Sequence, residues 1–306
     1  MKEEGVMQQK ITPNLWFDGN AQEAAGFYAS AFPEGKVGST IYYPKSAEEG
    51  LAAFQLGLAG KVLTVDFEVG GFRFVAINAG PEFAFNPSIS FMLNFDPSRD
   101  GRAGEHLEEL WNRLIDGGEA LMPLGAYPFS KRYGWVKDRY GLTWQLILTD
   151  PAGEPRPFVI PSLMFSGENN NRAEEAIHHY LSVFEDARLG TLARYADDTG
   201  PARSGSLMFA DFTLAGQWFA AMDSGVEHDF NFNEAISLSI ACQDQAEIDY
   251  FWEKLSAVPG AEQCGWSKDR FGVSWQVVPA NMEELMNKPH AFANMMQMRK
   301  IEIAKF

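Results

Sequence analysis

One stretch of this chain occurs twice. It reads GWVKDRYGLTWQLI at 134 to 147 and GWSKDRFGVSWQVV at 265 to 278. In each copy, two runs of strand-forming residues flank Lys-Asp-Arg-aromatic-Gly, and Asp138 and Gly141 stand at the positions where a type I turn prefers Asp and Gly. Both copies therefore predict a β-hairpin. The turn explains the Asp and the Gly, but it does not explain the Trp-Gln pair that follows in each copy.

The hairpin is the end of a longer repeat. Three further segments recur in the same order: ITPNLWFDGNAQEAAGFYASAF (11–32) as VIPSLMFSGENNNRAEEAIHHYLSVF (159–184), VDFEVGGFRFVAINAG (65–80) as ADFTLAGQWFAAMDSG (210–225), and FNPSISFMLNF (85–95) as FNEAISLSIAC (232–242). Self-similarity of this kind indicates tandem copies of one domain.

The repeat also predicts the domain boundaries. We expect a first domain at 1–150, a linker at 151–158, a second domain at 159–280 and a helical tail at 281–306. The linker PAGEPRPF contains three prolines, which suits a stiff connection.

Hydrophobic periodicity predicts the elements of each copy. In the first copy they are strand 15–17, helix 21–32, strands 36–43, 61–69 and 72–78, then strand 88–95, helix 102–117, a weak strand near 120 and the two hairpin strands. Each domain is therefore expected to contain the order βαβββ twice, which places the chain in the α+β class.

These elements and four motifs resemble a known group of proteins. The motifs are LWFDGNAQEAAGFY, DFEVGGFRFVAINAGP, FNPSISF and GWVKDRYGLTWQL, and they resemble the vicinal oxygen chelate superfamily of glyoxalases, bleomycin-resistance proteins and dioxygenases. Within it they are most similar to the PhnB-like branch, the so-called 3-demethylubiquinone 3-methyltransferase family. The resemblance covers nearly the whole chain. It implies tandem glyoxalase-like domains in which pairs of βαβββ modules curl mixed sheets into a cup, and we expect one cup in each half.

Composition argues against two classes of partner. The net charge is -16 and no run of Lys and Arg occurs, so a nucleic-acid surface is not expected. No apolar stretch of about 18 residues is present to span a membrane. The N-terminus MKEEGVMQQK lacks the apolar core of a signal peptide, so we expect a cytoplasmic protein in which Cys242 and Cys264 stay reduced.

The resemblance also implies where a metal would bind. Metal-dependent relatives carry His or Glu on the first and fourth strands of each module. The matching positions hold Thr12, Asn78 (or Ala76), Ser90 and Gln145 in the first half, and Ile160, Asp223 (or Ala221), Ser237 and Gln276 in the second. A transition metal prefers imidazole, thiolate or carboxylate ligands, and Asp223 alone does not make a site. We therefore expect no metal and no other cofactor.

Strand parity separates the two residues of the repeated Trp-Gln pair. Neighbours on a strand point to opposite faces, so if Gln145 faces the cup, Trp144 packs against the helices. A buried amide needs hydrogen-bond partners, which Asn14, Asn78 or Ser90 could supply. The candidate ligand-binding residues are Asn14, Trp16, Asn78, Ser90, Gln145, Ser162, Asp223, Ser237 and Gln276. A packed cup in which Gln145 only ties strands together explains the same residues.

Two functions of different classes fit these observations. The first is a metal-free protein that holds a small, partly apolar molecule in a cup, as bleomycin-resistance relatives do. The alternative is a metal-dependent lyase, isomerase or dioxygenase of the same superfamily, for which no catalytic residue can be named. Methyl transfer is not expected despite the family label, because no glycine-rich loop follows a strand and opens a helix.

The duplication itself predicts a quaternary-like arrangement. Single-domain relatives typically form two-fold dimers, and fusion through a short linker makes that contact intramolecular. We therefore expect the two halves to pack as a pseudo-dimer, and a further homodimer of the chain stays open. The Met-rich C-terminal tail has no counterpart after the first domain, and it either packs on the second domain alone or covers a seam between the halves.

Overall fold

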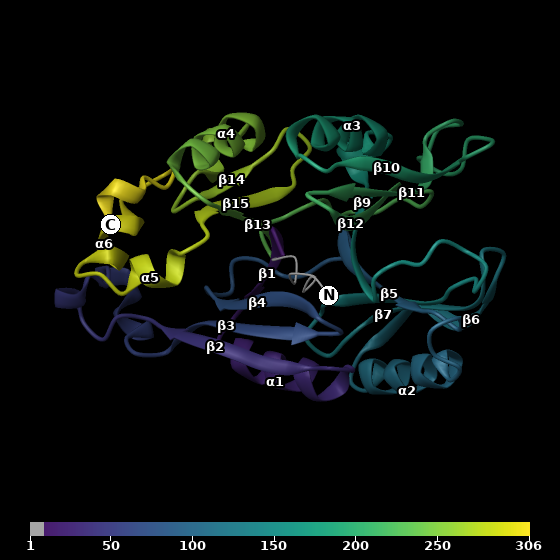
Figure 1. Cartoon of the computed structure of the whole chain (residues 1–306), viewed down its shortest axis with the longest axis horizontal. Helices are drawn as coiled ribbons and strands as arrows, with labels where there is room; N and C mark the ends of the chain where they lie inside the picture. The colour runs from purple at the N-terminus through teal and green to yellow at the C-terminus, as the bar shows by residue number, and fades with distance from the viewer. Residues whose placement is uncertain (1–8) are drawn as a thin grey trace, which may run out of the picture.

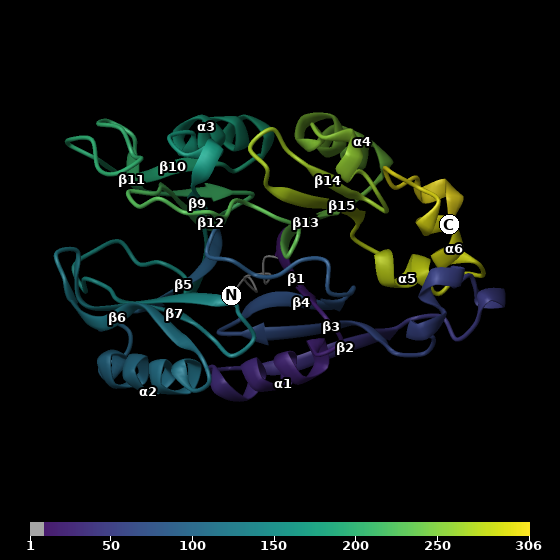
Figure 2. The same ribbon diagram turned by 180° about the vertical axis from the view of Figure 1, so that it is seen from behind.

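The protein contains two curved sheets with helices on their outer sides (Figure 1). This computed structural model describes residues 9 to 306. Residues 1 to 8, which hold most of the charged N-terminal stretch and the start of the expected first domain, lie outside the described residues. The view from behind shows the two sheets side by side in the same way (Figure 2).

Sheet A contains seven strands and sheet B contains eight. The order in sheet A is β14 (Trp266–Lys268), β15 (Ser274–Pro279), β13 (Ile236–Cys242), β1 (Ile11–Phe17), β4 (Phe72–Asn78), β3 (Val62–Val69) and β2 (Lys36–Tyr42). The order in sheet B is β10 (Arg188–Arg194), β11 (Leu207–Leu214), β12 (Gln217–Asp223), β9 (Val159–Phe165), β5 (Ile89–Phe95), β8 (Thr143–Leu148), β7 (Ser130–Lys137) and β6 (Glu119–Tyr127).

Each sheet combines strands from both halves of the chain. β1 pairs antiparallel with β13 in sheet A, and β9 pairs antiparallel with β5 in sheet B. The two junctions are equivalent by the repeat, because Asn14 lies opposite Ser237 in one and Ser162 lies opposite Ser90 in the other. The α+β class and the curved mixed sheets built from βαβββ modules are confirmed. The assignment of one cup to each half is wrong, because each sheet takes one module from each half.

The physical reason lies in the edges of the modules. A single four-stranded module leaves one side of its first strand unpaired, and an unpaired strand edge is exposed to wrong pairing. Pairing with a module of the other half covers that edge in both sheets. The two halves therefore form the expected intramolecular pair, and they do so by continuous hydrogen-bonded sheets rather than by surface contact alone.

Four helices cover the outer faces of the sheets (Figure 1). They are α1 (Ala21–Ala31), α2 (Ala103–Ile115), α3 (Ala173–Val183) and α4 (Gln245–Leu255). In α1, Ala24 and Tyr28 are buried at a spacing of one helical turn, and Ala176 and Tyr180 repeat this in α3. Small residues on this stripe let each helix lie close to its sheet.

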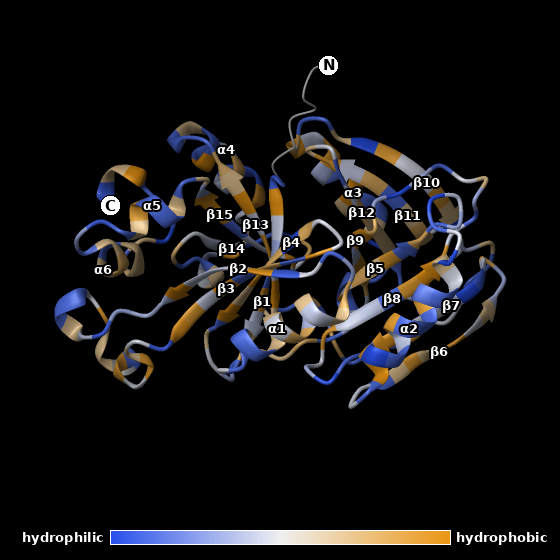
Figure 3. Ribbon diagram, turned by 60° about the horizontal axis from the view of Figure 1, so that its bottom comes forward, coloured by the Kyte–Doolittle hydropathy of each residue, from blue (hydrophilic) through white to orange (hydrophobic). Residues whose placement is uncertain are grey.

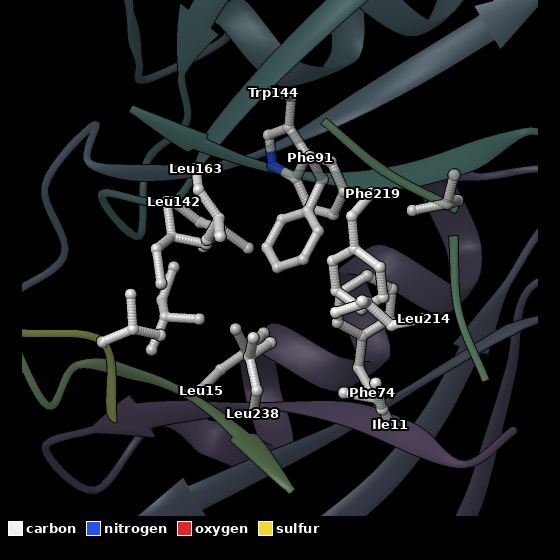
Figure 4. Packing of buried hydrophobic residues seen from close by; sticks show 14 of the residues in the cluster. Ile11, Leu15, Phe74, Phe91, Leu142, Trp144, Leu163, Leu214, Phe219 and Leu238 are labelled. Atoms are coloured by element: carbon white, nitrogen blue, oxygen red, sulfur yellow. The ribbon is translucent and has the colours of Figure 1, made fainter. Parts of the chain in front are cut away.

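The face of each sheet that carries the helices is only partly covered by them. The rest of it packs against the same face of the other sheet, and this contact forms the main core. Phe74 of sheet A lies 4.8 Å from Phe91 and 6.1 Å from Trp144 of sheet B, measured between ring centroids. Figure 4 shows these rings between aliphatic side chains of both sheets, among them Ile11, Leu15, Leu163, Leu214 and Leu238. Hydropathy colouring shows apolar residues along the central strands and mainly polar residues in the loops (Figure 3).

The last module of the chain is shorter than the other three. Its counterpart in the first half ends in the long hairpin β6–β7, whereas the second half has only a short turn, η4 (Pro259–Ala261), before β14. The C-terminal segment takes the vacant place, because the backbone N–H groups of Cys264 and Gly265 donate to the carbonyls of Met298 and Arg299 at 2.8 and 2.7 Å. The tail therefore borders β14 where β6 borders β7.

The tail then continues to the first half of the chain. It contains the short helices α5 (Met282–Met286) and α6 (Ala291–Met296), which lie at one end of the molecule beside sheet A (Figure 1). The ring of Phe292 lies 6.1 Å from that of Tyr43, and both belong to a small buried cluster with Leu51. The tail contacts both halves, so the seam hypothesis describes it and packing on the second domain alone does not. Within residues 9 to 306, none of the helices has the length and apolar character needed to cross a membrane.

Candidate functional site

The repeated hairpin is organised around one buried carboxylate. Asp138 starts the turn, with its carbonyl accepting from Gly141 at 2.9 Å. Its Oδ1 accepts from the backbone N–H groups of Tyr140 and Leu142. Its Oδ2 accepts from the Tyr28 hydroxyl and from Trp144 Nε1, both at 2.8 Å. The Asp therefore ties the turn to helix α1 and to the following strand.

The second half repeats this arrangement. Asp269 Oδ2 accepts from the Tyr180 hydroxyl at 2.7 Å and from Trp275 Nε1 at 2.9 Å. Burial raises the pKa of both carboxyls, and the hydrogen bonds from Trp and Tyr lower it again. The repeated Trp thus has a structural role, because it fills the core and donates a hydrogen bond to a buried carboxylate.

The prediction from strand parity is confirmed for Trp144 and Gln145. Trp144 is fully buried against α1, with its ring centroid 5.5 Å from that of Tyr28. Gln145 points to the opposite face of sheet B, which carries no helix. We call this helix-free face cup B in sheet B and cup A in sheet A. Its Oε1 accepts from the Tyr133 hydroxyl at 2.7 Å and its Nε2 donates to Ser90 Oγ at 2.8 Å. Of the three partners considered, Ser90 is the one that the structure brings to Gln145.

The candidate residues divide between the cups differently from the prediction. Ser90, Gln145 and Ser162 share cup B, since Ser90 lies opposite Ser162. Asn14, Trp16, Ser237 and Gln276 share cup A, where Gln276 Nε2 donates to Ser237 Oγ at 2.9 Å. Trp16 and Gln145 therefore do not act in one cup, because β1 joins sheet A while β8 joins sheet B.

Asn78 and Asp223 do not face a cup. Asn78 lies on the same face of β4 as the core residue Phe74, and its Oδ1 accepts from the N–H of Ala21 at the start of α1. Asp223 accepts from the N–H of Ala173 at the start of α3 and from that of Leu207. Both hold a helix to its sheet, and burial raises the pKa of Asp223. Both were expected to face a cup, and the structure places them on the opposite face, because a shift of one residue along a strand reverses the face.

Cup B contains a cavity of about 300 Å³. Its apolar lining comes from five different strands and one hairpin tip: Met92, Phe129, Ile147, Ile160, Phe209 and Ala220. Neighbouring residues on adjacent strands connect the cavity to the predicted site residues Gln145 and Ser162. Gln145 lies beside Met92, which lies beside Ile160, and Ser162 lies beside Ala220. Of these, the sequence identifies Ile160, which matches a metal-ligand position, but not the other five. Met92 and Ile147 could have been found, because they stand two residues from Ser90 and Gln145 on the same strands.

One edge of the cavity is charged and ordered by the linker. Arg156 Nε donates to Asp211 Oδ2 at 2.9 Å, and their side chains are 13% and 8% exposed. The Arg156 guanidinium also lies 3.9 Å from the centroid of the Trp218 ring. Because both side chains are largely buried, loss of either one would leave the other as an unpaired buried charge. The linker was predicted as a stiff connection, and the structure shows in addition that it forms part of the cavity wall.

Some buried polar atoms of cup B have no partner. Among residues 9 to 306, Ser162 Oγ, Thr143 Oγ1 and Trp135 Nε1 are buried without a hydrogen-bond partner in the protein. Ser162 is fully buried, and its neighbour Ala220 lines the cavity. Leaving a buried polar group unpaired costs about 1–3 kcal/mol, so such groups mark places where another molecule can supply the partner.

A pocket of about 400 Å³, larger than the cup B cavity, is lined by Gln22, Tyr42 and Asn78. Two still larger grooves lie away from the cups. They have volumes of about 550 and 540 Å³ and border the ends of α1 and α3, at Phe32 and at Phe184. These residues are equivalent by the repeat. Grooves that recur at both corners are explained by the meeting of helix and sheet. We take the cup B cavity as the candidate site because it lies on the face of sheet B that carries Ser90 and Gln145.

Neither cup offers a suitable ligand set for a transition metal. The first strands of the modules present Thr12 and Ser237 in cup A, and Ser90 and Ile160 in cup B. In the part of the chain from 9 to 306, His, Cys, Asp and Glu do not come together in any group of three that could hold a metal ion. Hydroxyls and amides alone are poor ligands for zinc, nickel or iron.

Similarity to known proteins assigns the chain to a family. Residues 9–147 and 157–278 match the family described as 3-demethylubiquinone-9 3-methyltransferase. The chain belongs to this family. Its two matches are separated by residues 148–156, so the chain contains the family's domain twice. No curated protein matches the chain.

Several solved structures are similar to this chain in sequence or in fold. The PhnB protein from Bacillus cereus is 35% identical over 46% of this chain and 100% of its own, with a TM-score of 0.38. Protein PA1353 from Pseudomonas aeruginosa is 26% identical over 44% of this chain and 94% of its own, with a TM-score of 0.36. Glyoxalase I from Zea mays is 13% identical over 92% of this chain and 97% of its own, with a TM-score of 0.51, which shows a shared fold.

Proposed function

We propose that this family member is a metal-free protein that binds a small, uncharged and mainly apolar molecule in the cavity of cup B. The observation that carries the proposal is the cavity of about 300 Å³, in which an apolar floor meets a polar and charged edge, with the unpaired hydroxyl of Ser162 next to the lining residue Ala220. Binding sites for small molecules typically combine such walls with a few polar groups that fix orientation. Burial of ligand surface supplies about 25 cal/mol per Å² of apolar area.

The charges around the cavity restrict the ligand further. Its edge carries Asp150, Glu154 and Asp211 but only one basic residue, Arg156. Arg156 is already paired with Glu154 and Asp211 at 2.9 Å each. A negatively charged ligand would meet carboxylates without a free cation, so we propose an uncharged one.

The enzymatic alternative receives less support. A metal-dependent lyase, isomerase or dioxygenase needs ligands that neither cup provides, and the carboxylate of Asp223 is engaged with backbone amides on the helix-bearing face. Methyl transfer has no supporting feature either. Gly70 and Gly71 form the turn between β3 and β4, so they do not open a helix as a nucleotide-binding loop would.

Binding of the uncharged fluorophore 1-aminoanthracene tests the proposal. We expect its fluorescence to rise on addition of the protein. Ala220→Met, which adds a side chain inside the cavity, should weaken the affinity at least ten-fold. Val75→Met is the matched control, because Val75 occupies in cup A the position that Ala220 occupies in cup B. A dye that binds equally well to both variants would contradict the proposed site.

Metal dependence is tested on the same protein. We expect elemental analysis after dialysis against zinc, nickel, manganese or iron to find no stoichiometric ion, and dye affinity to be unchanged by these ions or by a chelator. One tightly held ion per chain would contradict the metal-free proposal and favour the enzymatic alternative.

A further inference from the structure

The two cups are equivalent by the repeat but carry different residues at the positions that line the cavity. Met92, Ile160 and Phe209 of cup B correspond to Ser239, Thr12 and Thr64 of cup A. The correspondence follows from the sheet registers: Ile160 lies opposite Met92, and Thr12 lies opposite Ser239. Three apolar side chains of cup B are thus replaced by three hydroxyl-bearing side chains in cup A.

The bulky residues of the cups also occupy different places. In cup A, Trp16 replaces the equivalent Met164 of cup B. The Trp16 ring packs edge-on against Phe83 at 5.0 Å and Trp266 at 5.9 Å, and its Nε1 donates to Gly80 O at 2.7 Å. Trp16 therefore has its polar and apolar partners within the protein, whereas Ser162 and Trp135 of cup B lack a hydrogen-bond partner. Ser274 of cup A and its equivalent Thr143 of cup B are both unpaired, so they do not distinguish the cups.

The charged residues at the edges of the two cups also differ. Trp218 of cup B corresponds to Arg73 of cup A, and Asp211 corresponds to Asp66. In cup A, Asp66 pairs with Arg73 of the neighbouring strand at 2.7 Å, whereas in cup B Asp211 pairs with Arg156 of the linker, which stacks on Trp218.

Gene fusion accounts for the asymmetry, because only one of the two equivalent corners can contain the linker. The linker joins β8 to β9 in sheet B and brings Arg156 to the cavity wall. The equivalent corner of sheet A lies between the end of β15 and the start of β1. No linker joins these two ends, because β15 continues into the C-terminal tail and β1 is the first strand of the chain. The tip residue Phe129 of the long β6–β7 hairpin also lines the cavity, and within residues 9 to 306 this hairpin has no counterpart beside cup A.

We infer that each chain contains one ligand site, cup B, and that Met92, Ile160 and Phe209 determine its preference for an apolar ligand. Cup A is built from both halves in the same way and has a structural role. This inference rests on the proposed function, since it specifies which of the two cups binds and by which side chains.

Stoichiometry tests the inference, again with 1-aminoanthracene as the probe. Titration of the full chain at concentrations well above the dissociation constant should give one dye per chain. The variant Met92→Ser/Ile160→Thr gives cup B the side chains of cup A, and we expect it to lower dye affinity at least ten-fold. The matched variant Ser239→Met gives cup A an apolar residue of cup B and should leave the original site unchanged.

The possible results separate the inference from the proposed function. No dye binding by the full chain would contradict both. Two dyes per chain, or one dye that survives in Met92→Ser/Ile160→Thr, would overturn the inference and leave small-molecule binding intact. Circular dichroism and thermal unfolding verify folding of each variant. Ala220→Met provides a second test, because it fills the cavity while keeping cup B apolar.

Discussion

Asp138 and Asp269 show how one residue can explain a repeated motif. Each carboxylate accepts four hydrogen bonds, two from backbone amides of its own turn, one from a Tyr of the first helix and one from the Trp six residues later. A buried carboxylate without such donors would be strongly destabilising. The Trp of the Trp-Gln pair is therefore required by the Asp, whereas the Gln organises the cup on the opposite face.

Replacement of Trp144 tests this role. Trp144→Ala removes a fully buried ring and one donor to Asp138, so we expect a loss of about 3–5 kcal/mol in the free energy of unfolding. Trp266→Ala, at a half-buried position of cup A, should cost less. Urea denaturation of both variants measures the difference. Equal losses would mean that the hydrogen bond to Asp138 and the buried core position add nothing.

The two buried tyrosines predict a pH dependence. Burial, followed by the nearby carboxylate, raises the pKa of Tyr28 and of Tyr180 well above the ordinary value of 10.0. The neutral phenols therefore favour the folded state. Their contribution is fully present below the pKa of the unfolded chain, about 10, and decreases as the pH rises beyond it, because the unfolded chain then releases protons that the folded chain keeps.

The variant Tyr28→Phe/Tyr180→Phe checks the sign of this effect. At pH 7 each substitution should cost about 1.5–3 kcal/mol, since a hydrogen bond to a carboxylate is lost. Above pH 10 the free energy of unfolding of the double variant should fall less steeply than that of the parent protein. Parallel pH profiles from denaturant titrations would contradict the assignment.

At the scale of elements, the C-terminal tail compensates for a missing strand. The segment around Met298 and Arg299 pairs with the backbone next to β14, and Phe292 then packs on Tyr43 and Leu51 of the first half. A sheet edge is thereby covered and the two halves are joined a second time, at the corner where no linker passes. The tail could be recognised in the sequence as an addition, but its partner on the first half could not.

Truncation of Phe292 tests the contribution of the tail. Phe292→Ala leaves a gap in a small cluster with Tyr43 and Leu51, and we expect a loss of about 3 kcal/mol, at the lower end for a Phe→Ala change because the cluster is small. Val226→Ala, at a position with 64% exposure, is the control and should change stability by less than about 0.5 kcal/mol. Thermal unfolding that shows no difference between the two would mean that the tail is not anchored there.

At the scale of the whole molecule, the shared sheets make the two halves interdependent. Residues 1–150 alone would leave β1 without β13 and β5 without β9, so two strand edges and the helix-bearing core face would be exposed. We expect this fragment to form a homodimer by the same pairings, and to form a one-to-one complex when co-expressed with residues 151–306. Light scattering measures the masses, and a stable monomeric fragment would contradict this interdependence.

Much of this protein was predictable from local sequence. The duplication, the strand and helix order, the turn at Asp138 and the opposite orientation of Trp144 and Gln145 follow from periodicity, turn chemistry and strand parity, which depend only on near neighbours in the chain. The predicted element boundaries agree with those of β2, β4 and α1 to within a residue. Register was less certain, and Asn78 and Asp223 were assigned to the wrong face because a shift of one residue reverses a strand.

Only the tertiary structure decided how the modules combine. Each module leaves the edge of its first strand unpaired, and two partners are available with nearly the same pairing surface: the other module of its own half, or one of the other half. Local sequence is the same in both cases. The structure shows exchange between the halves, which moves Trp16 and Gln145 into different cups and builds the cavity from Met92 and Ile160. The sequence determined the modules, and the geometry of their long-range pairing determined the site.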